Sequence, residues 1–276
     1  MALQASVIIS TYNSETWLEK VLWGFSLQTA TNFEIVIADD GSRETTQQLI
    51  ELMREHVPFP IKHVWQEDKG FQKSRILNKA ILATSSDYLI FTDGDCVPRK
   101  DFVQTHLDYR QKGHFLSGGY FMLPLMVSNL ILREDILAQR CFDIHWLLRH
   151  GVFRNYKNLK ISADGFFARF LNRVTTTKPT WNGHNSSGWK SDIEAVNGFN
   201  QSMQYGGQDR ELGERLSNNG VQGIQIRYSA KVIHLEHSRE YVTEEMLERS
   251  LAIRQNTQKN KLKWTENGLQ QANESF

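Results

Sequence analysis

The sequence predicts an α/β protein built on a parallel sheet, and two observations support this. Short β-branched apolar runs alternate with segments whose apolar residues recur at helical spacing through roughly the first hundred residues. Polar and acidic clusters follow three of these runs directly, as is usual where the strands of such a sheet end. Strands separated by helices favour a Rossmann-like sheet that is covered by helices on both faces.

The predicted strands of the first half are "ASVIIST", "FEIVIAD", "IKHVWQ" and "DYLIF", at residues 5–11, 33–39, 61–66 and 87–91. Helices are predicted between them from three apolar sets: Trp17, Leu18, Val21, Leu22 and Phe25; Leu49, Ile50, Leu52 and Met53; Ile76, Leu77, Ala80 and Ile81. The clusters "STYN", "DDGS" and "DGD" follow the first, second and fourth strands. A ligand site is expected there, since parallel sheets bind ligands beyond the carboxyl ends of their strands.

The regular alternation fades in the second half. Residues 114–123, "HFLSGGYFML", predict a strand with a glycine pair, and residues 128–151 predict an amphipathic helical stretch with Ser128 as N-cap and Gly151 as stop. Residues 175–189, "TTTKPTWNGHNSSGW", are rich in turn formers and predict a loop beside the site. Short helices are predicted in residues 191–199 and 206–220, two strands in 224–237 and a helix from Thr243.

Composition restricts the class of protein. The chain has 276 residues, of which 40% are hydrophobic, enough for one large domain or two closely fused halves. A net charge of +1 argues against nucleic acid as a partner. Cys96 and Cys141 are too few for a disulfide framework, and the first residues do not resemble a signal peptide. The apolar stretches are too interrupted to span a membrane, so a soluble, cytoplasmic protein is expected.

Asp93 and Asp95 flank Gly94 at the end of the fourth predicted strand. A turn at Gly94 would let both carboxylates approach one hard cation, and such ligands suit Mg²⁺ or Mn²⁺ together with the phosphates of a substrate. The alternative is an ordinary turn, because Asp and Gly are common turn formers.

Taken together, these segments resemble family 2 glycosyltransferases, inverting enzymes with the GT-A nucleotide-sugar fold. The resemblance runs through "VIISTYNSE", "VIADDGS", "QEDKGFQKSRILNKAI", "DYLIFTDGDCVPRKDF", "GWKSDIEAVNGFN" and "YGGQDRELGERL". The later part is similar to the acceptor half of β-1,4-galactosyltransferases and bacterial chondroitin-type polymerases. The resemblance implies a nucleotide-sugar-binding half (1–110), an acceptor-binding and catalytic half (111–242) and a C-terminal helical tail (243–276).

The resemblance also implies a nucleotide site. It places Ser10, Thr11 and Tyr12 near the nucleotide, with Tyr12 able to stack on uracil. Asp40 is implied to accept a hydrogen bond from the uracil N–H. An ordinary half-buried aromatic, or a turn or N-cap role for Asp39 and Asp40, is the alternative.

For the diphosphate, the family's usual Arg before Asn78 is Leu77 here. Lys73 and Arg75 are therefore substitutes of the right charge, and either could be an ordinary solvated residue. Lys73, Asn78 and Asp93 complete the implied nucleotide-binding residues.

The implied metal ligands are Asp93, Asp95 and His234, which lies in a late strand. Asp95 is the direct ligand, and Asp93 is shared between the metal and the ribose. His237 is the competitor of His234, and a satisfied core histidine is the alternative. Mn²⁺ or Mg²⁺ is the implied cofactor.

Asp209 in "YGGQDREL" matches the family's catalytic base, while Gln208 replaces the usual Glu before it. Asp209 could instead be a first-turn acid that the helix dipole favours. Gln208 and the loop residues Trp181, Asn185 and Trp189 are candidates for binding sugar or acceptor, with ordinary loop packing as the alternative.

The resemblance therefore implies a metal-dependent, inverting transfer of a hexose or N-acetylhexosamine from a UDP-sugar to a saccharide or glycolipid acceptor, as in lipopolysaccharide or capsule biosynthesis. One alternative is a non-catalytic nucleotide-sugar or glycan-binding protein, which Gln208 favours. The other is a sugar-phosphate nucleotidyltransferase. Such enzymes usually carry a glycine-rich basic loop after the first strand, and the segment "STYNSETW" at that place is not one. Peripheral contact with the inner face of the membrane is compatible with Lys259, Lys261 and Lys263 near Trp264, which equally suit a solvated end.

Overall fold

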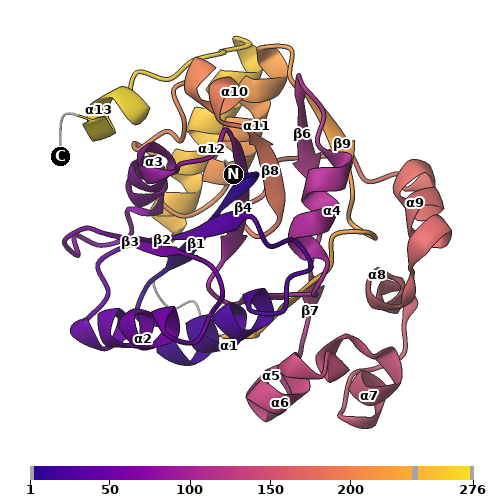
Figure 1. Ribbon diagram of the computed structural model, residues 1–276. Helices are drawn as coiled ribbons and strands as arrows, with labels where there is room; N and C mark the ends of the chain where they lie inside the picture. Colours follow the sequence, from indigo (N-terminus) through magenta and orange to yellow (C-terminus); the bar gives the residue numbers. More distant parts are fainter. Residues whose placement is uncertain (1–2, 238–241, 274–276) are drawn as a thin grey trace.

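A computed structural model describes residues 3–237 and 242–273 of the chain. Its centre is a seven-stranded sheet with the order β3-β2-β1-β4-β8-β6-β9 (Figure 1). The first four strands in the sequence, β1 (Ala5–Thr11), β2 (Phe33–Asp39), β3 (Ile61–Trp65) and β4 (Tyr88–Asp93), pair in parallel. The predicted parallel sheet of the first half is confirmed.

The central strands are buried on both faces. In β1, Val7 and Ile9 belong to one hydrophobic core and Ile8 belongs to the other. Successive strand residues point to opposite faces, so a strand that is covered on both faces must be apolar at nearly every position. This requirement explains the continuous apolar runs of the first half of the sequence.

Helices cover both faces of the sheet (Figure 1). Residues of α1 (Glu15–Phe25) and α2 (Glu44–Arg54) contribute to the first core, together with α4 (Phe102–Tyr109). Residues of α3 (Lys73–Ala83) and α11 (Gln208–Asn218) contribute to the second core. The short α10 (Lys190–Ala195) also packs there.

Three later strands extend the same sheet beyond residue 110, so the two expected halves share one sheet. β8 (Ser186–Trp189) lies antiparallel between β4 and β6 (His114–Ser117), and β9 (Gln222–Gln225) pairs in parallel with β6. The prediction of a loop through residue 189 is therefore wrong for its last four residues. Ser186, Ser187 and Gly188 are small residues typical of loops, but pairing with a strand on each side overrides that preference.

A second, three-stranded sheet has the order β5-β10-β7, formed by β5 (Cys96–Pro98), β10 (Val232–His234) and β7 (Phe121–Met122). The single strand predicted for residues 114–123 is thus divided between the two sheets. The division falls at the glycine pair, where a Cβ on Gly118 would lie 2.1 Å from the side chain of Asn185. Only glycine lets the chain pass that close to Asn185.

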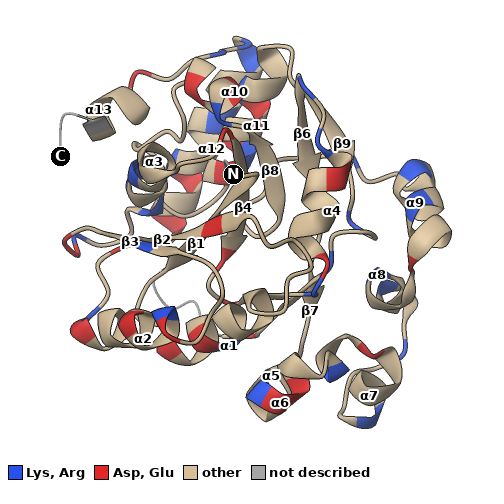
Figure 2. Ribbon diagram, in the orientation of Figure 1, with Lys and Arg blue, Asp and Glu red and all other residues tan. Residues whose placement is uncertain are grey.

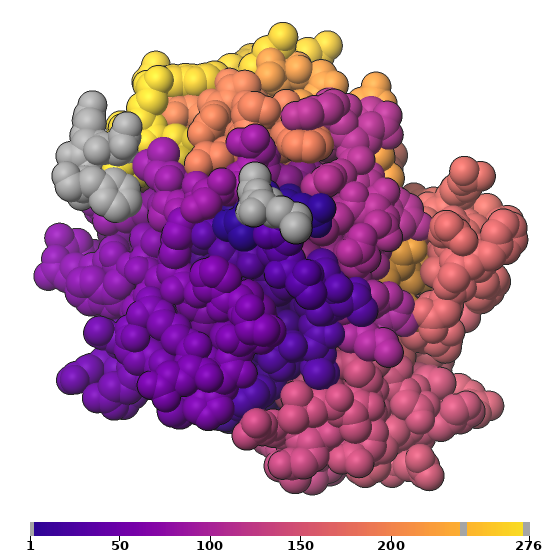
Figure 3. Space-filling view, in the orientation of Figure 1, coloured from indigo at the N-terminus to yellow at the C-terminus, as the bar shows by residue number. Residues whose placement is uncertain are grey.

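Residues 125–174 project from one side of the body as a series of short helices (Figures 1 and 3). They are α5 (Leu125–Leu130), α6 (Arg133–Leu137), η1 (Arg140–Phe142), α7 (Ile144–Arg149), η2 (Tyr156–Asn158), α8 (Leu159–Ser162) and α9 (Gly165–Val174).

The continuous helical stretch predicted for residues 128–151 is therefore wrong. Asp135 accepts a bond from the backbone of Leu132, and Asp143 accepts one from the backbone of His145, so each aspartate caps a new helix start. Ser128 lies inside α5 and donates to the carbonyl of Pro124 instead of capping. Gly151, with φ of +106°, does follow the end of α7.

The helix predicted from Thr243 is confirmed as α12 (Glu244–Lys259), whose first turn is capped by the Thr243 hydroxyl. It packs against α11, and the last helix, α13 (Leu269–Asn273), packs against α3. Within the described ranges, no helix has both the length and the apolar character that a membrane crossing requires.

Candidate functional site

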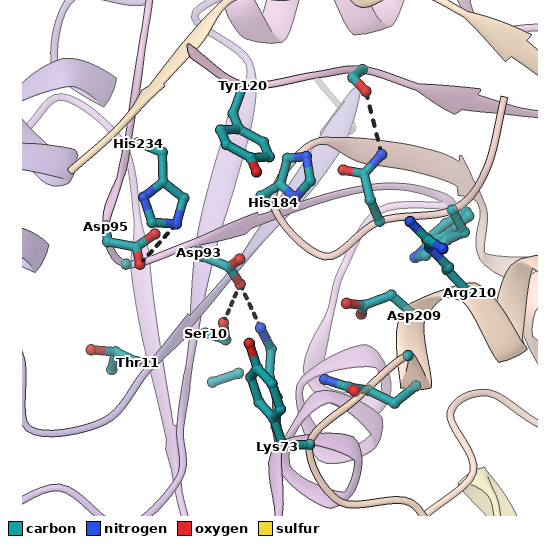
Figure 4. A pocket seen from close by; sticks show the side chains of 18 of the residues that line it. Ser10, Thr11, Lys73, Asp93, Asp95, Tyr120, His184, Asp209, Arg210 and His234 are labelled. Atoms are coloured by element: carbon teal, nitrogen blue, oxygen red, sulfur yellow. Dashed lines mark hydrogen bonds and ion pairs between the residues drawn. The ribbon is translucent and has the colours of Figure 1, made fainter. Parts of the chain in front are cut away.

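A pocket of about 930 Å³ opens at the carboxyl ends of β1, β2 and β4, where the sequence predicted a ligand site. Its size is that of a small-molecule or cofactor site. Most predicted site residues line it: Ser10, Thr11, Tyr12, Asp40, Lys73, Asp93, Asp95, Gln208, Asp209, His234 and His237. Figure 4 labels seven of them: Ser10, Thr11, Lys73, Asp93, Asp95, Asp209 and His234.

Asp93 is held by two partners at the floor of this pocket. Lys73 Nζ lies 2.6 Å and Ser10 Oγ 2.7 Å from the same oxygen, Asp93 Oδ1. Burial alone would raise the pKa of Asp93, but Lys73 and Ser10 outweigh it and hold that pKa well below the usual range. Asp93 is therefore ionised, with its other oxygen left for a ligand or cation.

Asp40 lies at the end of the neighbouring strand. Its carboxylate accepts bonds from Gln66 Nε2 at 2.6 Å and from the backbone N–H of Gln72 at 2.9 Å. Burial raises the pKa of Asp40 to about 6, although these bonds oppose the shift. Asp39 has the turn role that was the alternative, because it accepts from the Ser42 backbone.

Tyr12 borders the mouth of the pocket, and 48% of its surface is exposed. Its hydroxyl donates to Asp68 Oδ2 at 2.8 Å. The tether fixes the phenol and leaves the ring at the edge of the opening, where a planar base could stack.

Asp95, His234 and His237 form a cluster whose potential ligand atoms all lie within 4.8 Å of one another. Asp95 Oδ2 lies 2.8 Å from Nε2 of His237 and 3.4 Å from Nε2 of His234. Oxygen and imidazole donors at this separation fit a divalent cation such as Mn²⁺. Cys96 is adjacent, but burial raises the pKa of its thiol, which disfavours the thiolate needed for metal binding.

Asp209 lies in the first turn of α11, where two glycines lead into the helix. Gly206 and Gly207 have φ of +112° and +97°, and a Cβ on Gly207 would come within 2.8 Å of Arg254. A Cβ on Gly183 would lie 3.0 Å from both Asp209 oxygens, so the facing loop is also close. Burial raises the pKa of Asp209, while Lys73 opposes the shift.

The sequence reasoning missed His184 and Tyr120, which line the pocket beside the cation cluster (Figure 4). The Tyr120 ring lies 4.6 Å from the His184 ring and 5.3 Å from the His234 ring. Burial lowers the pKa of His184 to about 4, so this imidazole is neutral near pH 7. The signal was present, since His184 belongs to the loop that the sequence singled out.

Four further basic residues that line the pocket were also missed: Lys160, Lys178, Arg210 and Arg227. Lys160 comes from α8 and donates to the carbonyl of Tyr120. Their wide separation along the chain left no local pattern to detect.

Four predicted binding residues do not offer their side chains to the pocket. Asn78 is buried and exchanges two bonds with the backbone of Phe199, and Asn185 is buried and donates to the carbonyls of Gly119 and Ala230. Both amides satisfy buried backbone groups, so the binding roles predicted for them are wrong.

The sugar-binding or acceptor-binding roles predicted for Trp181 and Trp189 also differ from what the structure shows. Trp181 borders the pocket, but its ring is fully buried against Phe91 and Phe115 and cannot present a face to a sugar. Trp189 pairs with Tyr88 at the opposite end of β4, and Lys112 Nζ lies 3.4 Å above its ring. Both residues pack the structure.

The central sheet is mixed but mostly parallel, is covered by helices on both faces and carries the pocket beyond its strand ends. Solved glycosyltransferases of the GT-A class have this fold. The chain belongs to glycosyl transferase family 2, whose sequence model matches residues 6–170. A second model, described as the N-terminal domain of galactosyltransferase, matches residues 172–238.

Relatives by sequence include validoxylamine A glucosyltransferase of Streptomyces hygroscopicus subsp. limoneus, 33% identical over 78% of this chain and 48% of the relative. Chondroitin synthase of Escherichia coli is 24% identical over 78% of this chain and 32% of the relative. The chain thus spans about half the length, or less, of these two relatives.

Solved structures of similar fold include two that contain a bound nucleotide-sugar. The mannosyltransferase PcManGT from Pyrobaculum calidifontis, in complex with GDP-Man and Mn²⁺, matches with a TM-score of 0.59 at 16% identity, over 87% of this chain and 59% of that one. S. aureus TarS 1–349, in complex with UDP-GlcNAc, matches with a TM-score of 0.55 at 15% identity, over 87% and 60%. At these identities the similarity concerns the fold.

Proposed function

We propose that the protein is a metal-dependent, inverting glycosyltransferase that transfers a hexose or N-acetylhexosamine from a UDP-sugar to a saccharide acceptor. The observation that carries this proposal is the convergence of Asp93, the Asp95 cluster and Asp209 on one pocket. A plain turn at "DGD" would not require a carboxylate from a distant helix to lie in the same cavity.

On the donor side, Tyr12 and Asp40 would hold the uracil, by stacking and by accepting its N–H. Lys73 already contacts Asp93 and would place its positive charge next to the diphosphate. UDP is taken as the nucleotide because the family resemblance implies it; of the two solved structures of similar fold, one binds UDP-GlcNAc and the other GDP-Man.

A divalent cation held by Asp95 with His234 or His237, and shared with Asp93, would offset the charge of the departing diphosphate. In the transfer itself, Asp209 takes the proton of the acceptor hydroxyl while that oxygen forms a bond to the sugar C1. The C1–O bond to the diphosphate breaks on the opposite face, and UDP leaves with the electron pair. Anomeric inversion follows from the single displacement.

Incubating the protein with a panel of UDP-sugars and Mn²⁺, with and without saccharide acceptors, tests this proposal. Release of UDP from one sugar, absent from an Asp209→Asn control, is expected. NMR of the product should show that the anomeric configuration is inverted. No release from any donor, or a retained configuration, would contradict the assignment.

A non-catalytic nucleotide-sugar or glycan-binding protein is the second candidate, because Gln208 stands where the family usually has an acid. Tight UDP binding without turnover on any acceptor would favour it. Retention of both Asp209 and the Asp95 cluster favours the enzyme. We place its reaction in the synthesis of a bacterial surface glycan, such as lipopolysaccharide or capsule.

A further inference from the structure

The projecting helices present large aromatic side chains to solvent. Phe153, Tyr156 and Phe166 are exposed over 83%, 80% and 79% of their surfaces, and Phe167 and Phe170 over about half. A soluble surface rarely gathers so many exposed aromatic rings without a partner. We call residues 149–178, which contain these rings, the aromatic arm.

Helix α9 carries its apolar side outward. Its buried residues, Ala168 and Asn172, are four apart and face the body, whereas the exposed Phe166, Phe170 and Val174 follow one another on the opposite face. An ordinary surface helix has the reverse arrangement, with its apolar stripe toward the core. The outward face of α9 is therefore built to meet another apolar phase.

The aromatic arm is also strongly basic. It contains seven lysine and arginine residues and one acid, Asp164, although the whole chain has a net charge of only +1. Figure 2 shows this basic character on α8 and α9. Asp164 forms ion pairs with Arg99 and Lys231 of the body, so its charge does not offset the basic side chains on the outward face.

The aromatic arm adjoins the pocket, which Lys160, Thr177 and Lys178 of the arm help to line. Lys160 lines the pocket, and the preceding residues of the same segment, Tyr156 and Leu159, are exposed on the outer surface. A molecule that rests against the arm therefore lies next to the pocket.

We infer that the aromatic arm docks on the surface of an anionic phospholipid bilayer, with Phe166 and Phe170 at the acyl boundary and Arg169 and Arg173 among the headgroups. Aromatic rings beside basic side chains are the composition that binds such interfaces. A second copy of the chain is disfavoured, because pairing this face with itself would bring like charges together. Docking there would bring a glycolipid acceptor to the pocket, a consequence that rests on the proposed function.

Flotation of the full chain with lipid vesicles tests this inference. The protein should float with vesicles of phosphatidylcholine and phosphatidylglycerol but not with phosphatidylcholine alone. Arg169→Gln/Arg173→Gln and Phe166→Ser/Phe170→Ser should each weaken partitioning by about tenfold or more. Two matched controls should float like wild type: Leu52→Ser, which alters an exposed apolar residue of α2, and Lys259→Gln/Lys261→Gln/Lys263→Gln, which alters the basic C-terminal segment.

Equal flotation with neutral vesicles, or loss of flotation only in the C-terminal variant, would overturn the inference. So would a dimer in light scattering that disappears in Phe166→Ser/Phe170→Ser, since a second copy would then cover the face. Circular dichroism and thermal unfolding show whether each variant is folded. Because flotation needs no turnover, absence of UDP release would defeat the proposed function and leave this result intact.

Discussion

Lys73 and Asp93 form an ion pair across the floor of the pocket, with Lys73 Nζ 2.6 Å from Asp93 Oδ1. Lys73 begins α3 and Asp93 ends β4, so the pair ties a helix start to a strand end. Its second effect is electrostatic, because the lysine offsets the charge of a pocket that also contains Asp95 and Asp209.

Lys73→Met should therefore reduce both stability and donor binding. We expect a loss of about 1–3 kcal/mol in the free energy of unfolding, since both side chains remain partly exposed and the pair is not deeply buried. Because the folded-state pKa of Asp93 lies below its ordinary value of 3.8, the contribution is present above that pH and is lost as pH falls below it.

Urea unfolding of wild type and Lys73→Met at pH 7 and pH 3 measures the difference between their free energies of unfolding at each pH. The gap between the two proteins should be larger at pH 7. A gap that is unchanged at pH 3 would show that the ion pair does not stabilise the fold.

Asp209→Asn should lower kcat by roughly 10²–10⁴-fold while UDP-sugar affinity stays near wild type, as expected for loss of a general base. Because burial raises the pKa of Asp209, the acid limb of the kcat profile should lie above the ordinary aspartate value of 3.8. Gln208→Ala is the matched neighbour and should act chiefly through acceptor KM. An active Asp209→Asn enzyme would identify a different base.

Asp40→Ala should weaken UDP binding by about 1–3 kcal/mol, because a buried partner of the base would be lost. The pKa of Asp40 is about 6, so wild-type affinity should fall as pH decreases through that value, when the carboxylate is protonated. Calorimetry of UDP between pH 5 and pH 8 measures both effects. Unchanged affinity in the variant, or the same pH dependence in Asp40→Asn, would exclude the assignment.

Removal of the cation with EDTA should abolish turnover, and Asp95→Ala should remove metal-supported UDP binding. His234→Ala and His237→Ala, measured separately by Mn²⁺ titration, distinguish the two imidazoles that lie near Asp95. We expect His234→Ala to be the more damaging, because His234 is buried and is held in β10. Full turnover in EDTA would contradict a metal-dependent reaction.

Trp181→Ala should destabilise the fold by about 3–5 kcal/mol, the usual cost of emptying a large buried site. Acceptor KM should respond no more than the stability loss explains, because the ring has no open face. Trp189→Ala is the comparison variant, since Trp189 is part-exposed and pairs with Tyr88 at the end of β4 that lies away from the pocket. A raised KM with unchanged stability in Trp181→Ala would restore the sugar-binding role.

The sequence alone predicted the first four strands, the helices between them and the edge at which the pocket opens. These features follow from local rules: apolar periodicity identifies each element, and parallel strands bring their carboxyl ends to one edge. Ser10, Thr11, Asp40, Asp93 and Asp95 reach the pocket because each lies at such an end. The roles given to Asp209 and His234 came from the family resemblance instead.

Tertiary structure decided which polar residues face the pocket and which form hydrogen bonds with buried backbone groups. Asn78 and Asn185 lie in segments that adjoin the pocket, yet their amides donate to the buried carbonyls of Phe199 and Gly119. These partners are distant in the sequence, so no local pattern predicts the contacts. Residues 186–189 became a strand because β4 and β6 offer pairing on both sides. The outward face of α9 was also beyond sequence reasoning, since periodicity identifies an apolar stripe but does not say which side of a helix meets the body.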